Sequence, residues 1–279
     1  MQSAELQLHL EQTKEGPLSL PSDVEIGPLG RVWVVDSGNH RLVAFDSDGL
    51  FLFTVGKPGN SEGELQGPLG LGIDQDGNVY VADAGNFRIQ VFSREGKFIA
   101  ALPLEDRDGP IRPADVAVGK GGALFMTANT RHKVFKLNPD GRPITSWGNE
   151  GISQGEFRYP ATIVVNKGLV YVVDVLNTRV QIFDEKGKFR YQIGDWGVSP
   201  GQLFRPKGVA VDENGRAYVS DSYMDLVQVY GSGYKFDHVI GKSGTIQQFT
   251  APTGLAIDSA NRLYVCEMLA HRVSVRQLQ

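Results

Sequence analysis

Acidic and basic side chains recur at a fixed spacing along the chain, and they are the first candidates for chemistry. Segments such as DSGNHR and DAGNFR place an aspartate five positions before an arginine. The acidic members are Asp36, Asp83, Asp174 and Asp221, with Ala128 and Glu267 at the same place in two further segments. The basic members are Arg41, Arg88, Arg179 and Arg272, with Lys133 and Leu226 as departures.

These carboxylates have two possible roles. They could serve in catalysis or calcium binding, or they could stabilise the fold. A metal site gathers several carboxylates at one place, whereas these carboxylates are distributed over nearly every segment. An aspartate before a short polar loop accepts backbone N–H groups and pairs with the arginine that begins the next strand. We therefore interpret the repeated pairs as structural.

Three histidines also share one position of the repeat, which raises the question of a zinc site. His40, His132 and His271 each directly precede the basic residue position. In the architecture derived below this position lies in the third strand from the axis, and neighbouring strands are ~4.8 Å apart. We therefore do not expect the three imidazoles to share one ion.

A repeat of 45 to 47 residues organises the chain. Six units open at Pro21, Pro68, Pro113, Pro160, Pro206 and Pro252. Each unit holds short runs rich in Val, Ile, Phe and Tyr, such as NVYVAD and FRIQVF, separated by turn signals such as Asp76-Gly77. Four short strands per unit at this period predict an all-β fold, a six-bladed β-propeller with four antiparallel strands in each blade. We expect residues 1–279 to form one such domain.

The last unit lacks a fourth strand, because the chain ends at Gln279 after three strand-like runs. Near the other end, the segment from Glu5 to Leu10 alternates leucines with polar residues, which is typical of a strand with one buried face. An open ring would expose unpaired strand edges. The pattern therefore predicts that residues 5–10 complete the last blade and close the ring.

The segments DSGNHRLVAF, ADAGNFRIQVF and DVLNTRVQIF resemble NHL repeats, whose name reflects a triplet close to Asn39-His40-Arg41-Leu42. The resemblance covers all six units and implies a six-bladed propeller. It also implies an interaction or sensor module, since propellers of this family commonly have such roles. Similar propellers include amidating lyases and lactonase-like enzymes with metals in the channel, and some animal NHL domains bind RNA through an electropositive face.

Functional residues are expected where the repeat is broken. Two residues after the proline, three units have Gly70, Gly208 and Gly254, whereas the others have Asp23, Asp115 and Thr162. We expect this second group to border the mouth of the axial channel. There Asp23 and Asp115 suit a calcium or zinc ion, although a solvated mouth without any cofactor is the favoured interpretation.

A second break is a set of basic and aromatic side chains on loops that are expected to share one face. The set comprises Arg112, Arg131, Lys133, Arg158, Arg205 and Lys207, with Tyr159, Tyr223 and Met224. Such a surface suits phosphates, acidic peptides or single-stranded RNA. Acidic residues in neighbouring loops favour a mixed surface instead. Trp147 and Trp196 occupy similar positions, and we do not expect them to line a ligand-binding pocket.

Composition narrows the function classes. The net charge of −4 argues against nucleic acid as the main partner, and 41% hydrophobic residues suffice for a large core. Cys266 is the only cysteine, which excludes an intrachain disulfide. No apolar run is long enough to span a membrane, and no basic and apolar leader opens the chain. We expect a monomer, and an extracellular or periplasmic location is favoured over a cytoplasmic one.

Three functions follow from these observations. The favoured function is a non-enzymatic scaffold that presents its loop-bearing face to a protein, peptide or glycan. The alternative is a metal-dependent lyase or lactonase-like enzyme with a site at the channel mouth. The third is binding of single-stranded RNA by the basic set on blades 3–5.

Overall fold

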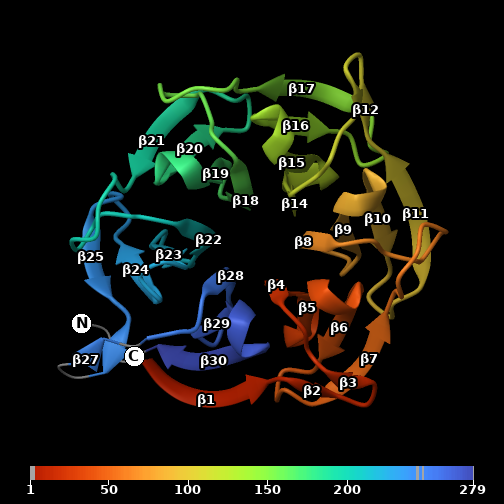
Figure 1. Ribbon diagram of the computed structural model, residues 1–279, viewed down its shortest axis with the longest axis horizontal. Helices are drawn as coiled ribbons and strands as arrows, with labels where there is room; N and C mark the ends of the chain where they lie inside the picture. Colours follow the sequence, from red (N-terminus) through yellow and green to blue (C-terminus); the bar gives the residue numbers. More distant parts are fainter. Residues whose placement is uncertain (1–3, 243–244, 247, 279) are drawn as a thin grey trace.

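Six four-stranded antiparallel sheets form a closed ring around a central axis (Figure 1). The computed structural model describes residues 4–242, 245–246 and 248–278. Blades 1 to 3 contain β4 (Pro21–Ile26), β5 (Val32–Asp36), β6 (Arg41–Phe45), β7 (Phe51–Val55), β8 (Pro68–Ile73), β9 (Val79–Asp83), β10 (Arg88–Phe92), β11 (Phe98–Pro103), β14 (Asp115–Val118), β15 (Leu124–Ala128), β16 (Lys133–Leu137) and β17 (Pro143–Trp147). Blades 4 to 6 contain β18 (Pro160–Asn166), β19 (Leu169–Asp174), β20 (Arg179–Asp184), β21 (Phe189–Ile193), β22 (Pro206–Val211), β23 (Ala217–Asp221), β24 (Leu226–Tyr230), β25 (Phe236–Val239), β28 (Pro252–Ile257), β29 (Arg262–Glu267), β30 (Arg272–Leu278) and β1 (Ala4–Leu10). The six-bladed propeller predicted from the repeat is confirmed.

Short elements connect the blades. Two-stranded hairpins precede blades 1, 3 and 6, namely β2 (Gln12–Thr13) with β3 (Gly16–Pro17), β12 (Glu105–Asp106) with β13 (Gly109–Pro110), and β26 (Gly241–Lys242) with β27 (Thr245–Ile246). Five 3-10 turns follow the second strands, namely η2 (Ser37–Asn39), η3 (Ala84–Asn86), η5 (Asn129–Arg131), η6 (Val175–Asn177) and η7 (Met268–Ala270). We call the side that carries these turns and the blade-connecting loops the loop face. The other side carries the turns between strands one and two and between strands three and four, and we call it the hairpin face.

The last blade is closed by the N-terminal strand, as the sequence predicts. β1 pairs antiparallel with β30, with Leu10 opposite Val273 and Ala4 opposite Leu278. Leu8 and Leu10 pack on the core between blades 6 and 1, whereas Leu6 is exposed. The backbone edge of β30 is therefore paired, and no three-stranded blade is left in the ring.

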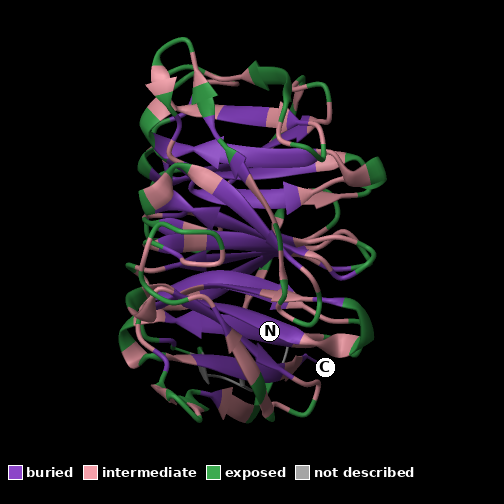
Figure 2. Ribbon diagram, turned by 90° about the vertical axis from the view of Figure 1, so that its right-hand side faces the viewer, coloured by how far each residue is buried: buried purple, intermediate pink, exposed green. Residues whose placement is uncertain are grey.

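Buried side chains form one apolar cluster at each junction between neighbouring blades. The second strands are buried along most of their length because both of their faces are covered by adjacent blades, as in the pattern of β5 and β9. Figure 2 shows the buried strands through the middle of the ring, with the exposed residues at the two faces and the rim. Among the described residues, no helix has the length and apolar character needed to cross a membrane.

Ring closure can be tested at Leu10. Replacing this buried side chain (Leu10→Ala) should lower the free energy of unfolding by ~2–5 kcal/mol, because it leaves a cavity where β1 packs on blade 6. Leu6→Ala on the same strand removes an exposed leucine and should cost less than ~0.5 kcal/mol. Urea unfolding followed by tryptophan fluorescence measures both. Equal effects of the two variants would contradict a closing role for the buried face of β1.

Candidate functional site

The repeated carboxylates lie buried under the loop face and hold its loops by hydrogen bonds. The Asp36 carboxylate accepts the Ser19 N–H at 2.6 Å and pairs with Arg41 Nε at 2.7 Å. Asp83, Asp174 and Glu267 repeat this arrangement with the backbone N–H groups of Gln66, Arg158 and Thr250 and the side chains of Arg88, Arg179 and Arg272. Each carboxylate thus ties the loop that enters a blade to the end of its second strand.

The histidines at the shared position connect neighbouring blades. His40 Nδ1 accepts the N–H of Gly67 at 2.8 Å, and His132 and His271 accept those of Tyr159 and Leu20. Each acceptor therefore belongs to one blade and each donor to the residue just before the proline of the next blade. In blade 5 the Asp225 carboxylate makes the same contact with the Ala251 N–H at 2.9 Å. The three imidazoles lie in separate blades, and each accepts a backbone N–H from the segment entering the next blade.

Blade 5 departs from this pattern, and its loop carries an exposed aromatic side chain. Leu226 replaces the arginine, and Asp221 accepts four backbone N–H groups instead, from Phe204, Arg205, Tyr223 and Met224. The Tyr223 ring stacks on Phe204, with centroids 4.1 Å apart and an interplanar angle of 33°. Tyr223 is 57% exposed. One buried carboxylate therefore holds both an exposed aromatic ring and the loop that carries Arg205.

The predicted basic residues divide into two groups. Arg131 pairs with Asp106 at 3.2 Å and donates to the Gly109 carbonyl, so it anchors the hairpin of β12 and β13. The other five, Arg112, Lys133, Arg158, Arg205 and Lys207, form no ion pair with any residue that the structure describes. Burial and the nearby Arg205 guanidinium lower the pKa of Lys207. These five cations on the loop face thus have no carboxylate partner among the described residues.

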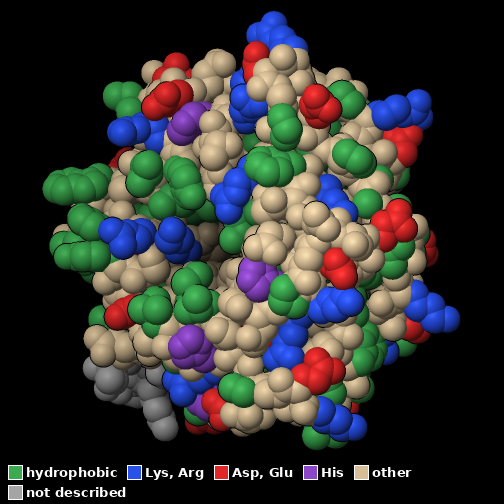
Figure 3. All heavy atoms as spheres, turned by 45° about the vertical axis from the view of Figure 1, so that its right-hand side comes forward, with side chains coloured by type: hydrophobic (Ala, Val, Ile, Leu, Met, Phe, Trp, Pro, Cys, Tyr) green, Lys and Arg blue, Asp and Glu red, His purple; other side chains and the backbone are tan. Residues whose placement is uncertain are grey.

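Large apolar side chains surround the basic residues of blades 4 and 5. Trp196 is 71% exposed and Leu176 59% exposed, and Ile152 and Val198 are also exposed. Figure 3 shows hydrophobic side chains gathered on one side of this face, next to basic side chains and the central hollow. We call Ile152, Leu176, Trp196, Val198 and Tyr223 with Arg158, Arg205 and Lys207 the blade 4–5 surface. The sequence interpretation set Trp196 aside, because its position in the repeat did not reveal its exposure.

Asp23 and Asp115 do not lie at a solvated channel mouth, which corrects the sequence interpretation. They are only 6% and 5% exposed. Asp23 Oδ2 accepts the Leu71 N–H of blade 2 at 3.0 Å, and Asp115 Oδ2 accepts the Ile163 N–H of blade 4 at 2.8 Å. The side chains fit because the preceding blade has glycine opposite them: a Cβ atom at Gly254 or Gly70 would collide with the carboxylate.

Burial dominates the electrostatics of these carboxyl groups. It raises the pKa of Asp23 to about 7, and it raises the pKa of Asp115 well above its ordinary value, with a further contribution from Asp23. Glu25 joins them, since burial and the nearby Asp23 raise its pKa to about 8. Within the described residues, no group of three or more His, Cys, Asp or Glu side chains is arranged to hold a metal. A calcium or zinc ion at Asp23 and Asp115 stays the alternative to a site without a cofactor, and elemental analysis decides between the two.

The hairpin face contains hollows that the sequence interpretation did not anticipate. Three of them, of about 830, 690 and 310 Å³, surround the channel mouth. They share a collar of half-buried side chains, one from each inner strand: Ile26, Ile73, Val118, Val165, Val211 and Ile257. The signal was present in the sequence, because each side chain stands five positions after a repeat proline.

Comparisons with known proteins agree with the repeat. A family model described as "6-bladed beta-propeller" matches residues 150–242, and the NHL repeat model matches residues 18–45 and 65–92. Protein brain tumor of Drosophila melanogaster is 34% identical over 132 residues, which are 46% of this chain and 12% of that protein. RING finger protein nhl-1 of Caenorhabditis elegans is 40% identical over 82 residues, 29% of this chain and 8% of that protein. The matched segments are thus a small part of these relatives.

Solved structures share the fold over almost the whole chain. A gluconolactonase from Xanthomonas campestris has a TM-score of 0.75 at 16% identity, covering 99% of this chain and 90% of that one. Virginiamycin B lyase from Staphylococcus aureus has a TM-score of 0.69 at 14% identity, covering 99% of this chain and 100% of that one. At these identities the likeness shows the fold alone.

The buried carboxyl of Asp23 makes stability depend on pH. Folding raises the pKa of Asp23 from 3.8 to about 7. Its contribution to the free energy of unfolding is therefore fully present below pH 3.8 and is lost progressively until the pH has risen through about 7. Asp23→Asn removes this loss and keeps an oxygen for the Leu71 N–H. The stability of the variant relative to the native protein should therefore increase by ~2.7 kcal/mol between pH 5 and pH 8, since one pKa unit corresponds to about 1.4 kcal/mol.

Thermal and urea unfolding at several pH values measure this difference. Asp48→Asn removes an exposed carboxylate and controls for the loss of one negative charge from the chain. A difference between native protein and Asp23→Asn that stays constant from pH 5 to pH 8 would show that Asp23 is ionised throughout.

Proposed function

We propose that this six-bladed β-propeller, of which residues 18–45 and 65–92 match the NHL repeat, is a non-catalytic binding module for a protein or peptide. The partner segment carries carboxylates beside apolar side chains. It binds the blade 4–5 surface on the loop face. The ring supplies a rigid support, and the loops supply the contacts.

One observation carries this proposal: large exposed apolar side chains surround basic residues that have no carboxylate partner among the described residues. Contiguous exposed apolar surface of this kind typically marks an interaction site. Tyr, Trp and Arg are enriched at the centre of protein interfaces. Trp196, Tyr223 and Arg205 are such residues, and Asp221 and Phe204 hold two of them in position.

The charge of the surface selects the class of partner. Arg158, Arg205 and Lys207 have no ion pair within the described part of the chain, so a partner carboxylate can bind them without breaking an existing bond. The lowered pKa of Lys207 has burial and Arg205 as its causes, and an incoming anion would relieve the repulsion between the two cations. An acidic peptide therefore fits better than a neutral glycan.

The lyase and gluconolactonase resemblances support only the fold, so they do not move the proposal towards catalysis. If the protein is instead a metal-dependent enzyme, we expect a stoichiometric calcium or zinc ion near Asp23 and Asp115. Elemental analysis of the purified protein, with a thermal-shift titration of both ions after chelation, tests it. A bound ion whose removal lowers the melting temperature would favour the enzyme.

A peptide array tests the proposal directly. Random peptides probed with the labelled propeller should yield binders enriched in Asp and Glu together with Leu, Phe or Trp. Arg205→Glu should weaken the best binder by at least ~10-fold, a loss of about 1.4 kcal/mol, because it places like charges together. Trp196→Ser should weaken it by a similar factor, because it removes apolar contact area.

Two control variants match these changes in chemistry but lie elsewhere. Arg107→Glu reverses an exposed arginine at the tip of the β12–β13 hairpin, and Leu50→Ser removes an exposed leucine on the hairpin face. Neither should change binding. Equal losses in the control variants, or binders without acidic residues, would contradict the proposal. Binding of single-stranded RNA that falls steeply with salt would favour the nucleic-acid alternative.

A further inference from the structure

Blade 1 lacks a carboxylate that three other blades use to hold their first hairpin. In blades 2, 5 and 6 the residue directly after the inner strand is Asp74, Asp212 or Asp258, six positions after the repeat proline. Each carboxylate accepts backbone N–H groups of its own turn. Blade 1 has Gly27 at this position.

Two side chains donate to that carboxylate in the intact blades. The residue four positions later is Asn78, Arg216 or Arg262, and Arg262 Nε lies 2.7 Å from Asp258 Oδ2. The residue six positions later is a tyrosine whose hydroxyl donates to the same carboxylate, as Tyr264 does at 3.1 Å. The carboxylate, a tyrosine hydroxyl and either an arginine or, in blade 2, an asparagine thus form one hydrogen-bonded cluster in these blades.

Blade 1 keeps both donors although the acceptor is gone. Arg31 stands at the arginine position and Trp33 at the aromatic position. Arg31 Nη1 turns instead to the Arg94 carbonyl, and its guanidinium lies over the Phe53 ring. The Trp33 indole N–H has no hydrogen-bond partner among the described residues. Blade 3 differs, because there Gly119, Ala123 and Phe125 replace the acceptor and both donors together.

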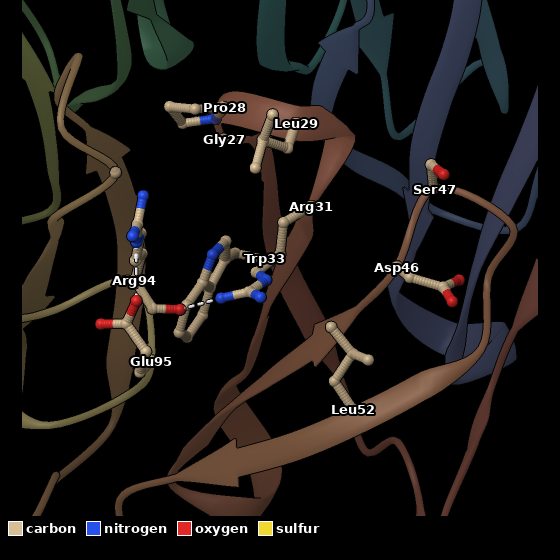
Figure 4. A pocket seen from close by; sticks show the side chains of 11 residues that line it. Gly27, Pro28, Leu29, Arg31, Trp33, Asp46, Ser47, Leu52, Arg94 and Glu95 are labelled. Carbon is tan, nitrogen blue, oxygen red and sulfur yellow. Dashed lines mark hydrogen bonds and ion pairs between the residues drawn. The ribbon is translucent and has the colours of Figure 1, made fainter.

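A cavity of about 380 Å³ occupies this part of blade 1 and reaches the neighbouring hairpin of blade 2. Figure 4 shows Trp33 between Arg31 and Arg94, with its nitrogen towards Pro28 and Leu29. Leu52 lines another side of the cavity. This volume lies at the lower end of the range for small-molecule pockets.

Leu29 makes the apolar part of the cavity unusual. It is 94% exposed and has a left-handed backbone with φ of 64°, where blade 3 has Gly121. A leucine in this conformation costs roughly 1 kcal/mol and gains nothing from burial. Such a residue is consistent with a role that depends on contact with another molecule.

We propose that this cavity binds a small organic carboxylate with an apolar body. The carboxylate takes the place of the missing aspartate and accepts hydrogen bonds from Arg31 and the Trp33 indole. The apolar body packs on Pro28, Leu29 and Leu52. This site lies on the hairpin face, so it is independent of the proposed peptide-binding surface.

Gly27→Asp supplies the missing carboxylate from the chain itself and is the decisive variant. The backbone of Gly27 is extended, with φ of −82°, and a Cβ atom there would lie no closer than 3.5 Å to Ile73. The variant should therefore fold, with the new carboxylate on Arg31. Binding should be lost because the position is occupied.

The test uses 4-phenylbutyrate and its neutral amide as probes, with ligand-observed NMR and isothermal titration. The acid should bind with a Kd of ~1 mM or tighter, and the amide at least ~10-fold more weakly. Gly27→Asp and Arg31→Gln should each weaken the acid at least ~10-fold. Arg216→Gln, at the same position in blade 5, should leave binding unchanged.

Three outcomes would overturn the proposal. They are equal binding of acid and amide, undiminished binding to Gly27→Asp, and no binding of the acid to native protein. Circular dichroism and the melting temperature show whether each variant is folded. Arg31→Gln keeps the test valid if Gly27→Asp fails to fold.

Discussion

Each blade has two apolar faces that only its neighbours can cover, and this requirement governs the rest of the structure. Six clusters of buried side chains fill the six junctions, so removing one blade would expose two of them. The ring must therefore close, and β1 closes it through backbone pairing with β30. His40, His132, His271 and Asp225 add a hydrogen bond across four of the junctions.

The contacts that support the ring recur in most blades, so a side chain can differ in one blade without loss of the fold. Blade 5 has lost the arginine partner of Asp221, yet four backbone donors satisfy that carboxylate and the loop now presents Tyr223. Blade 1 has lost the hairpin aspartate, yet Arg31 finds a carbonyl on blade 2. Neither change opens a junction, because the apolar clusters hold the ring independently. The departures therefore alter surfaces without requiring a different fold.

The two faces of the ring differ in chemistry, and buried carboxyl groups lie between them. Burial raises the pKa of Asp23 to about 7 and that of Glu25 to about 8, which favours their neutral forms. On the loop face, Arg205 and Lys207 form no ion pair with any described residue. The hairpin face has an aliphatic collar at its channel mouth instead, with the cavity beside Arg31 at one side.

The sequence by itself determined the number of blades, their boundaries, the closing strand and the pairing of Asp36 with Arg41. These are properties of local periodicity and short spacing, which a chain must satisfy wherever the blade lies. Only the tertiary structure decided burial and exposure at positions that look alike in the repeat. It buried Asp23 and Asp115 against glycines of the preceding blade, exposed Trp196, and paired Arg131 with Asp106. Such outcomes depend on contacts between side chains about 45 residues apart or in other loops, and local spacing carries no information about them.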